Sequence, residues 1–170
     1  MVGKMKQFFY LHFKEDDDGG VAYSSGEYGV DSAQGPVRFS INGMVQDYQA
    51  NDLGVPLMSI KLKNILESSV CEKHVWKPSF VEDGISISYE YFIPQFLGGI
   101  DVICREKSKI VNGPIGEVII KACLVENKIG DLEFFHLPNS SIRLIVSDRL
   151  KAKIEEGNLT GIDFSTVPVA

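Results

Sequence analysis

The clearest pattern of hydrophobic and polar positions is a nine-residue stretch that occurs twice. It reads Ser-x-Lys/Arg-Leu-Lys-x-x-Leu/Ile-Glu, at 59–67 and again at 147–155, with 147 − 59 = 88 residues between the two starts. In each copy a serine can cap a helix N-terminus, and two apolar residues four positions apart share one face. A short apolar run precedes each copy, so the pattern predicts two strand-into-amphipathic-helix units that pack on a core. It carries no catalytic residue type. Serine-capped amphipathic helices are common, so coincidence is the alternative explanation.

Period-two alternation of apolar and polar residues predicts strands through most of the remaining chain. The expected strands are 8–14, 37–41, 74–81, 85–91, 100–104, 117–126, 132–137 and 162–164. We expect a loop with little regular structure at 21–36, a chain reversal around 127–131, and Pro94 to end the strand that begins at Ile85. Gly157 is expected to stop the second helix in the left-handed conformation. These elements predict an α+β fold: one domain over residues 1–170, mainly antiparallel sheet with two or three amphipathic helices.

Composition bounds the class of protein. The chain has 170 residues, of which 44% are apolar and 24% charged, as in ordinary globular domains. Cys71, Cys104 and Cys123 are odd in number and lack metal-ligand spacing, which favours reduced thiols and a cytoplasmic location. The formal net charge of −6 argues against a nucleic-acid partner and is compatible with a basic protein partner, although it also serves solubility. No apolar run is long enough to cross a membrane.

Candidate chemistry is sparse. An acidic run at 15–18 invites a calcium-loop interpretation, but the sixth residue from Asp16 is Val21 rather than glycine, so a solvated turn is expected. Cys71 and His74 place a thiol near an imidazole, yet nothing beside them supplies an oxyanion hole. The three histidines lack zinc-site spacing, and no phosphate-binding glycine motif occurs. The sequence therefore predicts no metal, no cofactor and no enzymatic activity.

Several blocks in the last two thirds of the chain match a known family. They are 56–59 with Leu62 and Leu66, 91–94, 100–104, 131–137, 145–151 and 159–164. On these blocks the segment 55–167 resembles the bacterial immunity proteins of polymorphic-toxin systems catalogued as immunity family eleven, whereas residues 1–50 match least.

The resemblance implies a cytosolic protein that binds one cognate toxin and blocks it, with no membrane or nucleic-acid partner. Such toxins are delivered by contact-dependent or type VI-like secretion, often as the C-terminal tip of an Rhs-like protein. The matching blocks are structural, and the resemblance carries over no catalytic set. Immunity proteins block a toxin either by occluding its active site or by holding it in an inactive conformation. The mechanism expected here is occlusion of a basic active cleft by an acidic surface, with conformational inhibition as the alternative.

The predicted toxin-binding surface consists of acidic turns with neighbouring tyrosines. Its residues are Asp16, Asp17, Asp18, Tyr23, Glu27, Tyr28, Glu82 and Asp83. Two alternatives stay open at this point: a small cytosolic hydrolase using a cysteine and a histidine, and an adaptor domain of the secretion machinery. Thiol reactivity separates the first alternative from a binding protein, because a catalytic cysteine needs a lowered pKa.

Overall fold

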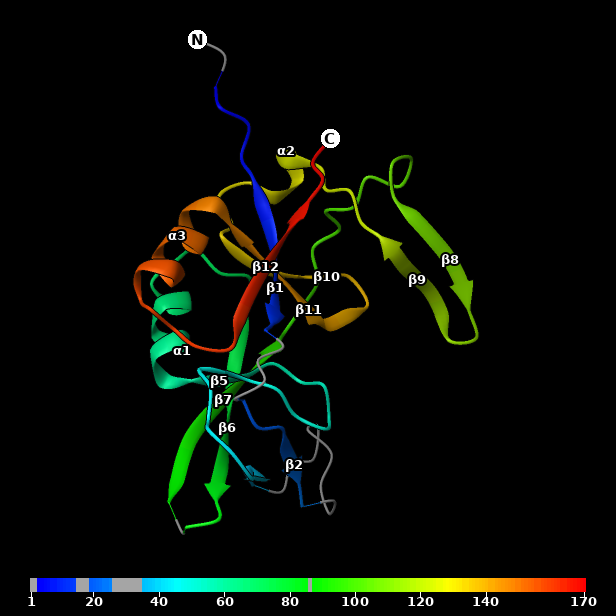
Figure 1. Cartoon of the computed structure of the whole chain (residues 1–170). Helices are drawn as coiled ribbons and strands as arrows, with labels where there is room; N and C mark the ends of the chain where they lie inside the picture. Colours follow the sequence, from blue (N-terminus) through cyan, green and yellow to red (C-terminus); the bar gives the residue numbers. More distant parts are fainter. Residues whose placement is uncertain (1–2, 15–18, 26–34, 86) are drawn as a thin grey trace.

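A computed structural model describes residues 3–14, 19–25, 35–85 and 87–170 (Figure 1). It contains a four-stranded sheet in the order β10-β11-β1-β12, a six-stranded sheet in the order β2-β3-β6-β7-β5-β4, and a separate β8-β9 pair. The strands are β1 (Phe8–Phe13), β2 (Ala22–Ser24), β3 (Val37–Ile41), β4 (Tyr48–Gln49), β5 (Leu57–Ser59), β6 (His74–Asp83), β7 (Ser88–Phe96), β8 (Lys109–Gly113), β9 (Gly116–Lys121), β10 (Phe134–Leu137), β11 (Ser140–Ser147) and β12 (Ile162–Val167). The helices are α1 (Ile60–Glu67), α2 (Glu126–Ile129) and α3 (Asp148–Glu156).

The predicted α+β class is confirmed. All the strand pairs in the sheets are antiparallel except β3 with β6, which run parallel. No helix in the described part of the chain is long and apolar enough to cross a membrane.

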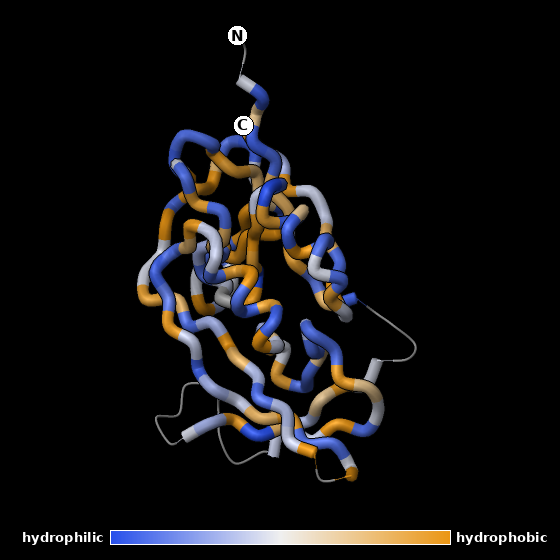
Figure 2. The backbone as a smooth tube through the Cα atoms, turned by 90° about the vertical axis from the view of Figure 1, so that its left-hand side faces the viewer, coloured by the Kyte–Doolittle hydropathy of each residue, from blue (hydrophilic) through white to orange (hydrophobic). Residues whose placement is uncertain are grey.

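The four-stranded sheet is covered on both faces. One face packs against α1 and α3, with Leu11 and Leu144 among its buried residues. The other face, which includes Phe8 and Ile145, packs against the segment that carries Val102. Hydrophobic positions run along the central strands of this half, and others lie in the six-stranded half, where a third buried cluster forms (Figure 2). The sheet is therefore the main support of the fold.

Both predicted strand-into-helix units form, and their helices lie side by side (Figure 1). Ser59 Oγ accepts a hydrogen bond from Leu62 N–H at 3.3 Å, and Ser147 Oγ accepts one from Leu150 N–H at 3.1 Å. The apolar residue four positions further, Leu66 or Ile154, is buried in the same cluster. Each serine thus caps its helix, and each apolar pair faces the core as the pattern predicts.

The two units also share a lysine contact: the repeated pattern contains Lys63 and Lys151 at the same position, and the structure shows what they touch. Lys63 Nζ lies over the rings of Trp76 and Phe92, at 5.6 and 5.1 Å from the centroids. Lys151 Nζ lies over Phe9 and Phe164 at 5.1 and 5.2 Å. Both lysines also pair with the glutamate four residues on. The lysine of α1 therefore contacts aromatic side chains of the six-stranded sheet, and the lysine of α3 contacts those of the four-stranded sheet.

Three predicted elements are wrong in kind. Residues 100–104 form no strand, because only Ile103 makes an isolated bridge, to Leu124. The predicted reversal at 127–131 is instead the short helix α2. The predicted loop at 21–36 contains β2, a three-residue strand that exists only by pairing with β3.

Other predicted boundaries also shift. The strand expected at 117–126 ends at Lys121, and the strand expected from Ile85 begins at Ser88. Pro94 does not end β7, which continues to Phe96.

Gly157 is not left-handed, since its φ is −73°. The left-handed residue is the next one, Asn158, with φ 49°. A Cβ at Gly157 would lie 3.0 Å from Ile65 Cδ1, so the glycine allows the close approach of α3 to α1 instead of a turn. The sequence pattern identified the right residue for the wrong physical reason.

Candidate functional site

One face of the six-stranded sheet is only partly covered. Register pairs place Tyr23, Ser40, Glu82 and Ser88 in one row across β2, β3, β6 and β7, so their side chains leave the same face. Helix α1 covers the other end of that face through Lys63. We call the uncovered part the open face, and its members are Tyr23, Arg38, Ser40, Phe80, Glu82, Ser88 and Glu90.

The open face carries an ordered group of charged and aromatic side chains. Arg38 Nη1 lies 3.1 Å from Glu82 Oε1, and the guanidinium carbon of Arg38 lies 5.2 Å from the Phe80 ring centroid. Tyr23 is 61% exposed beside this group. Because Arg38 and Glu82 are themselves about half exposed, their ion pair contributes little to stability. The group is better suited to contact with another molecule than to holding the fold together.

The structure brings together two of the predicted binding residues. Tyr23 and Glu82 share a face and are separated by one strand, β3, which corresponds to roughly 10 Å at the usual strand spacing. Asp83 is engaged within its own turn, where its Oδ1 accepts hydrogen bonds from Ile85 N–H and Ile87 N–H, both at 3.0 Å. The other predicted residues lie outside the described residues: Asp16, Asp17, Asp18, Glu27 and Tyr28.

Sequence reasoning missed Arg38, Phe80 and Glu90. The alternation that predicts a strand at 37–41 already places Arg38 on its polar phase, whereas the strand expected at 74–81 places Phe80 on the same phase as Trp76 and gives no sign that the ring is exposed. What no pattern indicates is that β3 and β6 are parallel neighbours, which is what puts these side chains next to one another.

A hollow of about 560 Å³ adjoins the open face at the start of α1. It lies between β7, the first residues of α1 and the loop that precedes β4, and its lining includes Asp47, Ile60, Lys61, Tyr89 and Glu90. Ile60 is 48% exposed there. The hollow therefore combines an exposed apolar side chain with charged groups.

Two polar groups fix the walls of this hollow. Tyr91 Oη donates a hydrogen bond to Gln46 O at 2.6 Å, and burial, with a smaller contribution from the charge of Asp47, raises the pKa of Tyr91. The Asp47 carboxylate accepts hydrogen bonds from Ser59 Oγ at 2.6 Å and from Thr160 N–H at 2.9 Å. All of these donors are neutral groups, so none of them forms an ion pair with Asp47.

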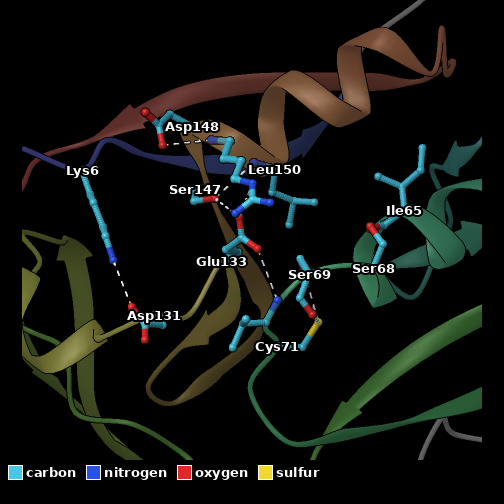
Figure 3. A network of polar contacts seen from close by, with 12 residues as sticks. Lys6, Ile65, Ser68, Ser69, Cys71, Asp131, Glu133, Ser147, Asp148 and Leu150 are labelled. Atoms are coloured by element: carbon cyan, nitrogen blue, oxygen red, sulfur yellow. Dashed lines mark hydrogen bonds and ion pairs between the residues drawn. The ribbon is translucent and has the colours of Figure 1, made fainter. Parts of the chain in front are cut away.

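A second hollow, of about 420 Å³, lies at the corresponding place beside α3 (Figure 3). Here the polar groups are paired with one another. Arg149 Nε lies 3.8 Å from Glu133 Oε1, and Lys6 Nζ lies 3.7 Å from Asp131 Oδ1. The backbone is paired as well, since Ser147 N–H donates to Glu133 O at 2.8 Å. The acidic residues of this hollow therefore pair with basic side chains, whereas Asp47 in the hollow beside α1 bonds to neutral donors.

The thiol and imidazole at Cys71 and His74 do not form a catalytic pair. Cys71 Sγ donates to Leu66 O at 3.1 Å, whereas His74 Nδ1 lies 2.7 Å from Glu72 O. Burial is the main cause that raises the pKa of the Cys71 thiol. A thiol held in its protonated form is a poor nucleophile, so the structure disfavours the hydrolase alternative at this cysteine.

Two further histidines make contacts with side chains that catalysis sometimes uses. His136 Nδ1 lies 2.6 Å from Glu72 Oε2, but this pair is buried and joins β10 to the segment between α1 and β6. His12 Nε2 lies 2.5 Å from Ser165 Oγ at an exposed position, and burial of part of the ring lowers the pKa of His12. Asp163 is opposite His12 in the register, yet its carboxylate accepts from Phe164 N–H. Within the described ranges, no three histidine, cysteine or acidic side chains are arranged to hold a metal ion.

Comparison with protein families matches residues 14–169 to Imm11, an immunity protein family. The match extends well beyond the segment 55–167 on which the sequence resemblance rested, and it includes both strand-into-helix units, the open face and the hollow beside α1. A comparison with curated proteins finds no match. Because the family match spans most of its length, the chain belongs to the Imm11 family of immunity proteins.

Proposed function

We propose that this protein binds one cognate toxin domain in the cytoplasm and neutralises it by occluding the toxin's active site. Membership of an immunity protein family is the observation that carries this proposal. Occlusion requires a specific interface of about 800 Å² on each partner, with a few dominant anchor residues. The proposed surface is the open face with the adjoining hollow.

The residue types of the open face support this choice. Tyrosine and arginine are among the side chains that most often dominate binding energy. Here Arg38 lies over the partly buried ring of Phe80, and Tyr23 leaves the same face in register with Ser40 and Glu82. Glu90 is exposed at the same face, and the whole chain has a formal net charge of −6. A basic active cleft would be attracted to such a surface, which speeds association. The acidic residues at 16–18, with Glu27, Tyr28 and Asp83, remain part of the proposed surface.

The toxin in this proposal is a secreted effector delivered by a contact-dependent or type VI/Rhs-like route and encoded by the neighbouring gene. The decisive experiment expresses that neighbouring gene with and without this protein. Co-expression is expected to restore growth, and the two proteins are expected to elute as one complex in size-exclusion chromatography. Growth arrest that co-expression leaves unchanged, or co-elution with a structural secretion component instead of the toxin, would overturn the proposal.

Variants of the open face test its part in binding. Replacing Tyr23→Ala together with Glu82→Lys removes one anchor and reverses one charge, so toxin affinity is expected to fall at least tenfold in a titration. Arg149→Ala is the matched control, because Arg149 is 74% exposed and lies at the hollow beside α3. A separate charge reversal of Asp16, Asp17 and Asp18 tests the acidic turn, and unchanged affinity would remove that turn from the surface.

A further inference from the structure

Strand β7 has a neighbour along only part of one edge. On one side it pairs with β6 from Ser88 to Phe96. On the other side β5 pairs only with Phe92 and Tyr91, because the chain leaves the sheet and enters α1 directly after Ser59. None of the described residues pairs with β7 beside 88–90 on that side. This free edge borders the hollow beside α1, whose lining includes Ser88, Tyr89 and Glu90.

The backbone groups of Ser88 and Glu90 point toward the hollow. Residues of an antiparallel strand direct their N–H and C=O groups to one neighbour and the other alternately. Asp83 N–H donates to Ile87 O at 3.0 Å, so the backbone of Ile87 faces β6. By alternation Tyr89 also faces β6, while Ser88 and Glu90 face the opposite way.

Two prolines agree with this assignment of backbone direction. Pro94 lies an even number of residues from Ser88 and Glu90 in β7, so its backbone points the same way as theirs. Pro78 in β6 is paired with Phe92, which also belongs to this set. Proline lacks the N–H that a hydrogen-bonded position would need, so both prolines fit only where the β6–β7 pair requires no donor. The same phase therefore leaves the N–H groups of Ser88 and Glu90 unused by β6.

The surroundings of the free edge favour a basic extended segment. Two acidic residues, Asp47 and Glu90, are among the residues that line the hollow, and Lys61 is the one basic residue among them. Exposed Ile60 adds an apolar contact at the start of α1. Unpaired N–H and C=O groups at a strand edge bind another extended chain through main-chain hydrogen bonds, and the side chains nearby select which chain binds.

We propose that the toxin supplies an extended segment that pairs with β7 beside Ser88 and Glu90, in the position that β5 leaves open. A lysine or arginine of that segment faces Asp47 and Glu90. This inference rests on the proposed function and specifies the contact that the toxin makes at the same surface.

Proline substitutions test the pairing without removing a side-chain contact. Ser88→Pro deletes a donor that points into the hollow and spares the β6–β7 hydrogen bonds, so the protein is expected to keep its melting temperature and to bind toxin roughly tenfold or more weakly. Ser88→Ala is the matched control and is expected to bind within about twofold of the wild type. Tyr89→Pro deletes a donor used within the sheet and is expected to lower the melting temperature.

Hydrogen exchange provides a test on the unaltered protein. The amides of Ser88 and Glu90 are expected to exchange fast in the free protein and to become protected in the toxin complex. If Ser88→Pro does not fold, this measurement decides alone. Unchanged exchange at both amides in a complex that forms, or full affinity of Ser88→Pro, would overturn the strand pairing and leave the proposed function intact. A wild-type protein that binds no toxin would overturn both.

Discussion

The two strand-into-helix units share a sequence pattern but differ in what surrounds their strands. Strand β11 has eight residues and is paired on both sides, by β1 and by β10. Strand β5 has only three residues and ends at Ser59, where α1 follows directly. Part of β7 is therefore left without a neighbouring strand on that side. The repeat thus specifies the capped helix and its buried face, whereas the lengths of the neighbouring strands decide whether the strand edge beside each helix is paired or free. The same local structure lies beside a fully paired strand in one unit and beside a free strand edge in the other.

The largest test of this comparison concerns the buried leucines. Leu62→Ala and Leu150→Ala each remove a fully buried side chain from the same cluster, so each is expected to lower the free energy of unfolding by about 2–5 kcal/mol. Urea denaturation measures both. Since α1 and α3 pack together, the double variant is expected to depart from additivity. A cost below about 1 kcal/mol in only one unit would show that the units are not equivalent supports.

The capping serines sharpen the comparison. Ser59→Ala and Ser147→Ala each remove an N-cap, which costs about 1 kcal/mol. Ser59 Oγ also donates to Asp47 Oδ1 at 2.6 Å, whereas Ser147 Oγ lies 3.5 Å from Glu133 Oε1. We therefore expect the Ser59 variant to be the less stable by roughly a further 1 kcal/mol in thermal or urea unfolding. Equal losses would mean that the contact with Asp47 contributes nothing to stability.

The smallest effect concerns the contact between the two helices. Gly157→Ala places a methyl group 3.0 Å from Ile65 Cδ1, so it is expected to destabilise the protein by about 0.5–1 kcal/mol, after the gain that alanine brings over glycine. Adding Ile65→Val removes the opposing methyl group and is expected to recover most of that loss. If Gly157→Ala alone raises the melting temperature, the Ile65 side chain can move aside without cost, and the close approach of α3 to α1 does not require a glycine at this position.

Sequence reasoning predicts well what depends on local spacing. Capping serines, the buried pairs on α1 and α3, and the strand at Val37–Ile41 all follow from residues within a few positions of one another. Elements that exist only through partners far along the chain are missed. The strand at Ala22–Ser24 forms only by pairing with β3. Pro94 remains within β7 because the backbone N–H at its position would not be used by β6.

The candidate site depends almost wholly on such distant partners. Tyr23 and Glu82 were predicted for their charge or ring, but only β3 between them places both on one face. The free edge beside Ser88 and Glu90 depends on the exact residue at which β5 stops, which no periodicity in the sequence specifies.

The shortness of that edge has a consequence for the protein when it is alone in the cell. An unpaired strand edge is where identical chains stack into aggregates. Here only three residues are available, a charged side chain stands at one end, and a helix blocks continuation past Ser59. A second copy of the chain therefore finds too little length at this edge to extend into a fibre.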